Sequence, residues 1–398
     1  MSFPETSSPA AMDPILLAFQ DFMADSRPEK CNLSVGMCYD ESGKIPVMRA
    51  VAEAQRRIGE RSAPWGYLMG EGLSSLREQS AQLLFGEVLR RDLGARVAVM
   101  QTLGGTGAVR LGAEMIGQLW GEAKIAVSRP TWMNHPAIFQ AAGRTVVEYD
   151  YYDREQGGIQ YEALLASLDA LDPGTVVVLH GCCHNPTGAD LDSEQWEAVA
   201  DLLVKRRHIA FLDVAYAGFG EGLDADMAPV RLLASKNIPL FIALSFSKSF
   251  ALYGERVGTL AIVASSEKQA HDLTEMLKGI TRTSYSTPPA HGALLVSEIL
   301  AAPELLTLWR EELESMRLRI AATRAELHAR LNDCNYDFSM LVRQKGLFSY
   351  TGLSQQQIIR MKDEYAVHAV SDGRICIAAI NSQNFERVAL ALQGVCEK

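Results

Sequence analysis

Short apolar runs alternate with segments of helical periodicity through the middle of the chain, from about Pro46 to Ala301. Each run has the length of a β-strand, and most are separated from the next by a helical segment. The predicted strands are Val97–Leu103, Lys124–Ser128, Thr145–Asp150, Thr175–Gly181, Ile209–Val214, Leu240–Phe246 and Val257–Ala264. Apolar strands that alternate with helices are typical of a mostly parallel sheet. The pattern therefore predicts an α/β fold.

The helical segments suggest how the chain is divided. They are predicted at Ile15–Ala24, Val47–Arg61, Ser74–Arg91, Trp196–Arg206 (after a capping-box pattern at Asp192–Gln195) and Leu305–Leu331. The last of these is long and carries the chain out of the α/β layer, and strands are expected beyond it near Asp337–Leu341 and Arg374–Ala379. We predict an N-terminal arm (1–40) that packs with a small α+β domain (303–398), and a large domain (41–302) between them.

Composition and charge exclude several classes of protein. The 398 residues carry a formal net charge of −10, which argues against a surface for nucleic acid or acidic lipid. Residues 1–14 have the features of neither a signal peptide nor a transit peptide, and the apolar runs are too short to cross a membrane. The seven cysteines show no C-x-x-C spacing, so neither a disulfide framework nor a metal site is expected. We expect a soluble, cytoplasmic protein with reduced thiols.

Two turns at predicted strand ends could contact a ligand. Gly104–Ala108 follows Val97–Leu103 and precedes a helix expected to begin near Val109. Backbone N–H groups at the positive end of a helix suit a phosphate, although many glycine-rich turns only connect elements. Asn185 precedes Pro186, which disfavours helical geometry and can direct the amide into a cleft. The alternative is a plain Asn-Pro turn.

An acid ends the next predicted strand. Asp213 follows the apolar residues Ile209–Leu212, and a carboxylate there is unfavourable unless it has a cationic partner. A protonated pyridine nitrogen would be such a partner, and the pair would make the ring an electron sink. Tyr216 could donate a hydrogen bond to a hydroxyl group of the same ring. The alternative is an Asp that caps a turn.

Hydroxyl and cationic groups follow the strand Leu240–Phe246. Ser245, Ser247 and Arg256 suit a phosphate dianion. Lys248 becomes a nucleophile only if its amine is deprotonated or condensed as an imine, and a neighbouring Arg256 favours deprotonation. Taken alone, Lys248 would be interpreted as a solvated charge. Because all these groups fall at strand ends of one sheet, they favour binding of one cofactor.

These segments resemble a known family. His184–Gly188, Asp213–Phe219, Ser245–Lys248 and Tyr253–Gly258 are similar to the motifs of the aspartate/aromatic aminotransferases, which are class I pyridoxal-phosphate enzymes. The likeness extends from Asp13 to the last predicted strand. It implies a fold-type-I architecture, amino-acid and 2-oxo-acid substrates, and a homodimer with shared active sites in which the N-terminal arm also contacts the partner subunit.

The resemblance also implies a role for each matching residue. Lys248 would bind pyridoxal 5'-phosphate as a Schiff base and move the substrate Cα proton, in a catalytic set with Asp213, Tyr216 and Trp132. The cofactor ring would be held by Trp132, Asn185, Asp213 (supported by His135) and Tyr216. The phosphate would be held by Gly105, Thr106, Ser245, Ser247, Arg256 and the partner subunit's Tyr67. The substrate would be bound by Gly36, Trp132, Asn185, Arg374 (on the α-carboxylate) and the partner subunit's Arg282 (on a distal carboxylate).

Several features of the sequence bear on which side chain the substrate carries. Arg282 favours dicarboxylates, whereas Met37, Tyr39 and Ile45 resemble the aromatic-tolerant members of the family. Apolar pocket walls discriminate by only about 1–3 kcal/mol per group. We predict ping-pong transfer of an amino group between an aromatic amino acid or aspartate and 2-oxoglutarate. The alternatives are a strict aspartate aminotransferase, a pyridoxal-phosphate β-lyase or decarboxylase, and a non-catalytic regulator.

Overall fold

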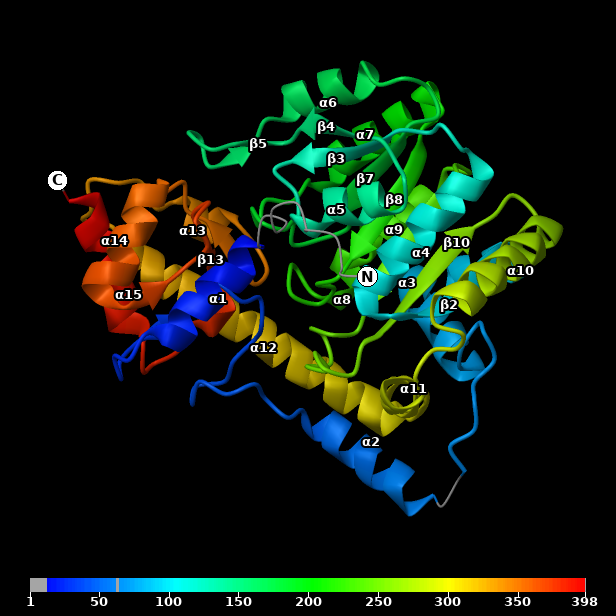
Figure 1. Cartoon of the computed structure of the whole chain (residues 1–398), viewed down its shortest axis with the longest axis horizontal. Coiled ribbons are helices and arrows are strands. Elements are labelled where there is room, and N and C mark those ends of the chain that lie inside the picture. Colours follow the sequence, from blue (N-terminus) through cyan, green and yellow to red (C-terminus); the bar gives the residue numbers. More distant parts are fainter. Residues whose placement is uncertain (1–12, 62–63, 398) are drawn as a thin grey trace, which may run out of the picture.

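A seven-stranded sheet organises the computed structural model, which describes residues 13–61 and 64–397 (Figure 1). The strands lie in the order β2 (Val97–Leu103), β10 (Val257–Val263), β9 (Leu240–Ser245), β8 (Ile209–Val214), β7 (Val176–His180), β3 (Ile125–Arg129) and β4 (Val146–Asp150). Strand β10 runs antiparallel to β2 and β9, and the other neighbouring strands are parallel. All seven predicted strands are present, and the predicted α/β class is confirmed.

Both faces of the sheet are buried. In β8, Ile209 and Phe211 belong to a hydrophobic cluster with α4 (Gly104–Leu119) and α10 (Glu267–Ser284), whereas Ala210 and Leu212 belong to a second cluster on the other face. That second cluster includes α3 (Ser74–Leu93), α7 (Ser193–Arg206) and α9 (Ala228–Ser235). Because alternate residues of a strand point to opposite faces, a strand covered on both sides is apolar throughout. This explains the continuous apolar runs in the sequence.

The remaining elements surround the sheet or extend beyond it. Short strand pairs are formed by β1 (Cys31–Asn32) with β12 (Val367–His368), β5 (Tyr152–Asp153) with β6 (Gly158–Ile159), and β11 (Phe348–Tyr350) with β13 (Arg374–Cys376). The other α-helices are α1 (Pro14–Ala24), α2 (Arg49–Glu60), α5 (Asn134–Ala141), α6 (Tyr161–Asp169), α8 (Leu223–Asp226), α11 (His291–Ala301), α12 (Pro303–Arg330), α13 (Met340–Arg343), α14 (Gln355–Tyr365) and α15 (Phe385–Cys396). Figure 1 shows α12 running from beside α11 to the group formed by α13, α14 and α15.

The described part of the N-terminal arm contacts the C-terminal elements. Strand β1 pairs in parallel with β12, and the Arg27 guanidinium donates hydrogen bonds to the carbonyl oxygens of Lys362 and Asp363. The division into 1–40, 41–302 and 303–398 stays a prediction. Residues 1–12, which form most of the segment predicted to be neither a signal nor a transit peptide, lie outside the described residues.

Three sequence predictions need correction. The strand expected near Asp337–Leu341 is wrong: the Asp337 carboxylate accepts hydrogen bonds from the backbone N–H and hydroxyl of Ser339, which makes a turn, and α13 follows. The expected strand at Arg374–Ala379 ends at Cys376 and continues as a 3₁₀ turn. The helix expected near Val109 begins at Gly104, so the glycine-rich turn forms its first turn.

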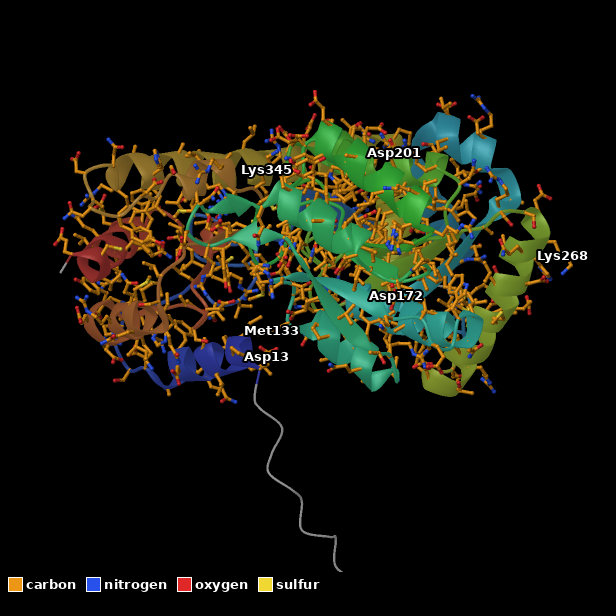
Figure 2. The ribbon with its side chains drawn as sticks, turned by 90° about the horizontal axis from the view of Figure 1, so that it is seen from above. Asp13, Met133, Asp172, Asp201, Lys268 and Lys345 are labelled. Carbon is orange, nitrogen blue, oxygen red and sulfur yellow. The ribbon has the colours of Figure 1, made fainter. Side chains whose placement is uncertain are left out.

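Many charged side chains lie on the outside of the molecule. Asp172, Asp201 and Lys268 are labelled at its surface in Figure 2, and their side chains are 71%, 71% and 84% exposed. Within the described residues no single helix has the length and apolar character of a membrane span. Helices α11 and α12 meet these criteria only when they are joined, and they are bent by 101° at their junction.

Candidate active site

A cavity opens at the edge of the sheet where the parallel strands end. Its lining includes most of the residues predicted to contact a cofactor. These are Gly105, Thr106, Trp132, Asn185, Asp213, Tyr216, Ser245, Ser247, Lys248 and Arg256, joined by His180 and Ala215. They come from the ends of separate strands, and their convergence follows from the parallel register of β7, β8 and β9.

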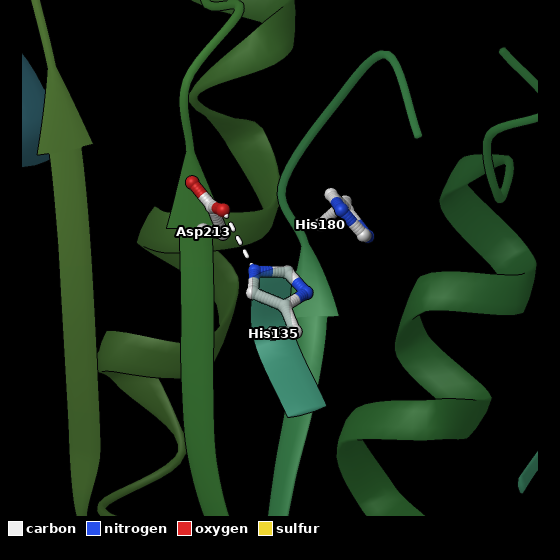
Figure 3. Close-up of side chains that lie close together, drawn as sticks. All are labelled: His135, His180 and Asp213. Atoms are coloured by element: carbon white, nitrogen blue, oxygen red, sulfur yellow. Dashed lines mark hydrogen bonds and ion pairs between the residues drawn. The ribbon is translucent and has the colours of Figure 1, made fainter. Parts of the chain in front are cut away.

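Asp213 lines this cavity, and its carboxylate faces the ring of His135 (Figure 3). His135 Nε2 lies 2.9 Å from Asp213 Oδ2, and His135 Nδ1 lies 2.9 Å from the hydroxyl of Thr131. A tautomer with its proton on Nε2 satisfies both contacts, because it donates to the carboxylate and accepts from the hydroxyl. The imidazole therefore fixes the orientation of the carboxylate.

The second oxygen of Asp213 is left for a ligand. Asp213 is 5% exposed, and its Oδ1 has no hydrogen-bond partner among the described residues. Burial alone would raise the pKa of Asp213, but the hydrogen bond from His135 and the nearby charge of Lys248 hold that pKa below its usual range. A buried, ionised carboxylate with one free oxygen is suited to a cationic partner such as a protonated ring nitrogen.

Lys248 faces the same cavity with an amine that loses its proton easily. Burial lowers the pKa of Lys248 to about 8; attraction by Asp213 opposes this shift, and repulsion by Arg256 and Arg374 adds to it. The sequence analysis attributed the activation to Arg256, whereas burial is the larger cause. Lys248 Nζ lies 5.2 Å from the centre of the Tyr216 ring. This amine can act as a nucleophile or base near neutral pH.

Hydroxyl, guanidinium and backbone groups gather at another side of the cavity. Gly105 lies in the first turn of α4, and a Cβ there would come within 3.1 Å of the Ser245 Cβ. Arg256 donates a hydrogen bond of 3.3 Å to the Ser247 hydroxyl, and a Cβ at Gly104 would lie 2.7 Å from its Nη2. Because Gly104 and Gly105 have no side chains, there is room for the Arg256 guanidinium and for an anion at the N-terminus of α4.

Arg374 reaches this region from β13. It is 4% exposed, and its guanidinium donates to the Asn185 side-chain oxygen at 3.2 Å and to the Ser34 carbonyl oxygen at 2.6 Å. The guanidinium also lies 4.3 Å from the centre of the Phe348 ring, and Nε has no partner among the described residues. A Cβ at Gly36 would clash with Phe348. Gly36 thus allows the ring under Arg374 to approach the backbone.

Comparison with known proteins identifies the family. The model of the family described as "Aminotransferase class I and II" matches residues 28–392 of this chain. The aspartate aminotransferase of Pseudomonas aeruginosa is 46% identical over 97% of this chain and 98% of its own length, and the aromatic-amino-acid aminotransferase of Escherichia coli is 44% identical over 97% and 98%. A crystal structure of the aromatic-amino-acid aminotransferase from Burkholderia pseudomallei, covalently bound to pyridoxal phosphate, superposes with a TM-score of 0.97 at 45% identity and covers 100% of both chains.

The chain belongs to the class I and II aminotransferase family. The predicted family and enzyme class are therefore confirmed. The roles of the individual residues stay predictions.

Two residues predicted to act across a dimer of this aminotransferase lie outside the cavity of their own chain. Tyr67 is 97% exposed, and Arg282 is exposed at the end of α10, where it donates a hydrogen bond to the Ser286 hydroxyl. A single chain of the aminotransferase thus leaves both side chains facing outward.

His180 is a lining residue of the aminotransferase site that the sequence analysis did not name. It ends β7 directly opposite Asp213 of β8, and its ring centre is 5.1 Å from that of His135 (Figure 3). Both of its ring nitrogens lack partners among the described residues, and burial, with repulsion by His135, lowers the pKa of His180 to about 3. The available signal was its position near the end of the predicted strand Thr175–Gly181, which precedes the strand that carries Asp213.

Proposed function

We propose that this enzyme transfers an amino group between an aromatic amino acid or aspartate and 2-oxoglutarate, in two half-reactions. The proposal rests on one arrangement: a buried lysine of lowered pKa, Lys248, shares a cavity with the half-partnered carboxylate of Asp213. Pyridoxal 5'-phosphate is the cofactor, as predicted from the sequence, and the related Burkholderia pseudomallei structure is covalently bound to it.

The residues of the cavity fit this cofactor. The free Oδ1 of Asp213 suits the ring nitrogen, and Trp132, which lines the same cavity, would stack on the cofactor ring. Tyr216 is buried, which raises the pKa of its hydroxyl and keeps it a hydrogen-bond donor near neutral pH. The phosphate would be held by Gly105, Thr106, Ser245, Ser247 and Arg256.

Pyridoxal phosphate supplies an electron-accepting ring that stabilises the charge left on the substrate Cα when its proton is removed. Asp213, oriented by His135, holds the proton on the ring nitrogen that gives the ring this property. Lys248 takes the proton from the substrate Cα, because burial leaves a large share of its amine neutral near pH 8. Arg374 binds the α-carboxylate and orients the Cα–H bond toward that amine.

The active enzyme in this proposal is a homodimer. Arg282 and Tyr67 are exposed in the single chain, so each is available to a neighbouring subunit. Arg282 would bind the distal carboxylate of aspartate or 2-oxoglutarate, and Tyr67 would reach the phosphate. The names of the two curated relatives, one aspartate and one aromatic, support acceptance of both substrate classes.

The test compares kcat/KM for aspartate and phenylalanine with 2-oxoglutarate as acceptor. We expect both to be used, with values within about 100-fold of each other, since apolar walls discriminate weakly. Arg282→Gln should lower kcat/KM for aspartate about 10- to 100-fold, because it removes a charge-assisted hydrogen bond. It should leave kcat/KM for phenylalanine nearly unchanged. Lys268→Gln, an exposed cation on the same helix (Figure 2), is the matched control.

Two outcomes would contradict the proposal. A preference for aspartate of more than about 1,000-fold would exceed what weak apolar discrimination gives and would indicate a strict aspartate enzyme. Product formed from the amino acid without any 2-oxo acid acceptor would indicate a β-lyase or decarboxylase.

A further inference from the structure

A second cavity lies at the opposite edge of the central sheet. It has a volume of about 520 Å³ and is enclosed by the start of β9, the end of β10, the C-terminal end of α4 and the first half of α10. Phe241 and Ser245 stand near opposite ends of β9, and Ser245 lines the active site. Phe241 and Ser245 are four positions apart, and a strand rises about 3.3 Å per residue, so the two cavities lie roughly 13 Å apart along that strand. This second cavity is therefore separate from the active site.

The walls of this cavity are apolar and partly aromatic. Trp120 packs edge-on against Phe241, with ring centres 6.2 Å apart and planes inclined by 68°. The other apolar lining residues are Leu119, Ile238, Pro239, Ile262, Val263, Ala264 and Leu273. A pocket of several hundred Å³ with aromatic walls has the size and character of a small-molecule site.

One cation stands among these walls. Arg96 is the only ionisable residue of the described chain that lines the cavity, where the remaining polar side chains are Asn237, Ser265 and Gln269. Within residues 13–61 and 64–397, the Arg96 guanidinium makes no ion pair and no side-chain hydrogen bond. This guanidinium gives the cavity a positive charge, which favours an anionic ligand.

We propose that this cavity binds an aromatic carboxylate, with its ring system against Trp120 and its carboxylate on Arg96. The Trp120 indole favours a flat apolar body by stacking and edge-to-face contact. The guanidinium favours a carboxylate through paired, charge-assisted hydrogen bonds. Because the cavity lies at the far edge of the sheet, the ligand is bound together with the ligands of the active site.

The experiment measures binding of 2-naphthoate to the holoenzyme by isothermal titration calorimetry, beside its neutral isostere naphthalene-2-carboxamide. We expect one naphthoate site per chain outside the active site and about tenfold weaker binding of the amide, which corresponds to one charge-assisted contact of about 1.4 kcal/mol. Octanoate, which carries the same charge on an aliphatic chain, should also bind more weakly than naphthoate. These comparisons need no variant.

Two variants then locate the site. Arg96→Gln should weaken naphthoate about tenfold and leave the amide unchanged, whereas Arg91→Gln, an exposed arginine just before it on α3, should change neither. Both should keep the wild-type transamination rate, which reports correct folding. Naphthoate bound at Arg374 in the active site would instead be lost in Arg374→Ala.

The remaining outcomes overturn the proposal. They are absence of naphthoate binding to the holoenzyme, equal affinity for naphthoate and its amide, octanoate binding as tightly as naphthoate, and binding that is lost in Arg374→Ala but unchanged in Arg96→Gln. Failure of the proposed transamination in a protein that still binds naphthoate through Arg96 would refute the function and leave this inference intact.

Discussion

Replacing Lys248 by methionine should stabilise the cofactor-free enzyme at neutral pH. The amine is buried, and burial lowers the pKa of Lys248 from 10.5 to about 8. Below pH 8 the amine is protonated in both the folded and the unfolded chain, so the folded state holds a charge that it accommodates poorly. Between pH 8 and 10.5 the unfolded state binds more protons, and the stability of the wild-type enzyme rises with pH. Above pH 10.5 the amine is neutral in both states, so the folded state no longer holds an unfavourable buried charge.

The size of this penalty follows from the shift in pKa. The difference between 10.5 and about 8 is some 2.5 units, and at 1.36 kcal/mol per unit it amounts to about 3 kcal/mol of unfolding free energy at pH 7. Methionine keeps the flexible unbranched stem without the charge and packs readily in irregular space. The variant should therefore be more stable than the wild type by about this amount at pH 7 and by almost nothing near pH 11.

The assay is urea unfolding of both cofactor-free proteins at pH 7, 9 and 10.5, at one protein concentration because the proposed dimer makes stability concentration-dependent. Lys268→Met, at an exposed lysine, is the control and should change stability by no more than about 0.5 kcal/mol. Equal stability of Lys248→Met and the wild type at pH 7, or a gain that does not decline with pH, would refute the argument that burial activates this lysine.

Further substitutions test other parts of the structure. Asp213→Asn should lower kcat for transamination by about 10²–10³-fold, the range for removing one preorganised electrostatic group, without unfolding the enzyme; a loss below tenfold in steady-state kinetics would contradict its role. Trp309→Phe should lower the unfolding free energy by about 1–3 kcal/mol, because the buried indole donates a 2.7 Å hydrogen bond to the Ser249 carbonyl oxygen that would lose its partner; an unchanged urea midpoint would count against it. Gly36→Ala should displace Phe348 and raise KM for every amino acid more than it lowers kcat; a normal KM would show that the ring does not position the carboxylate site.

The sequence predicts the central sheet well because burial on both faces leaves a clear pattern. Strands β7, β8 and β9 are apolar at almost every position and end in polar turns, so their existence and their parallel arrangement could both be inferred. The C-terminal part was harder to predict. At Asp337–Leu341 a few apolar residues resemble a strand, and the local hydrogen bonds of Asp337 decide in favour of a turn.

The candidate site was predictable to the extent that its residues stand at strand ends. Asp213 and Lys248 could be brought together from the chain alone, because parallel strands end at one edge. His180 was missed because its importance depends on the register that sets it opposite Asp213. The sequence analysis attributed the lowered pKa of Lys248 to the neighbouring charge of Arg256. Burial, the larger cause, becomes apparent only in the folded chain. The proposed roles of Arg282 and Tyr67 involve a second subunit, and they were predicted from the family resemblance because the residues alone do not indicate a dimer.

The central claim is that Lys248 carries the cofactor in the cavity beside Asp213, and reductive labelling tests it most directly. The holoenzyme is reduced with sodium borohydride, digested, and searched by mass spectrometry for a lysine that has gained the pyridoxyl phosphate group. The account predicts one such modification, at Lys248, and none in the Lys248→Met variant. Modification of a different lysine, or no stable modification in an active holoenzyme, would contradict it.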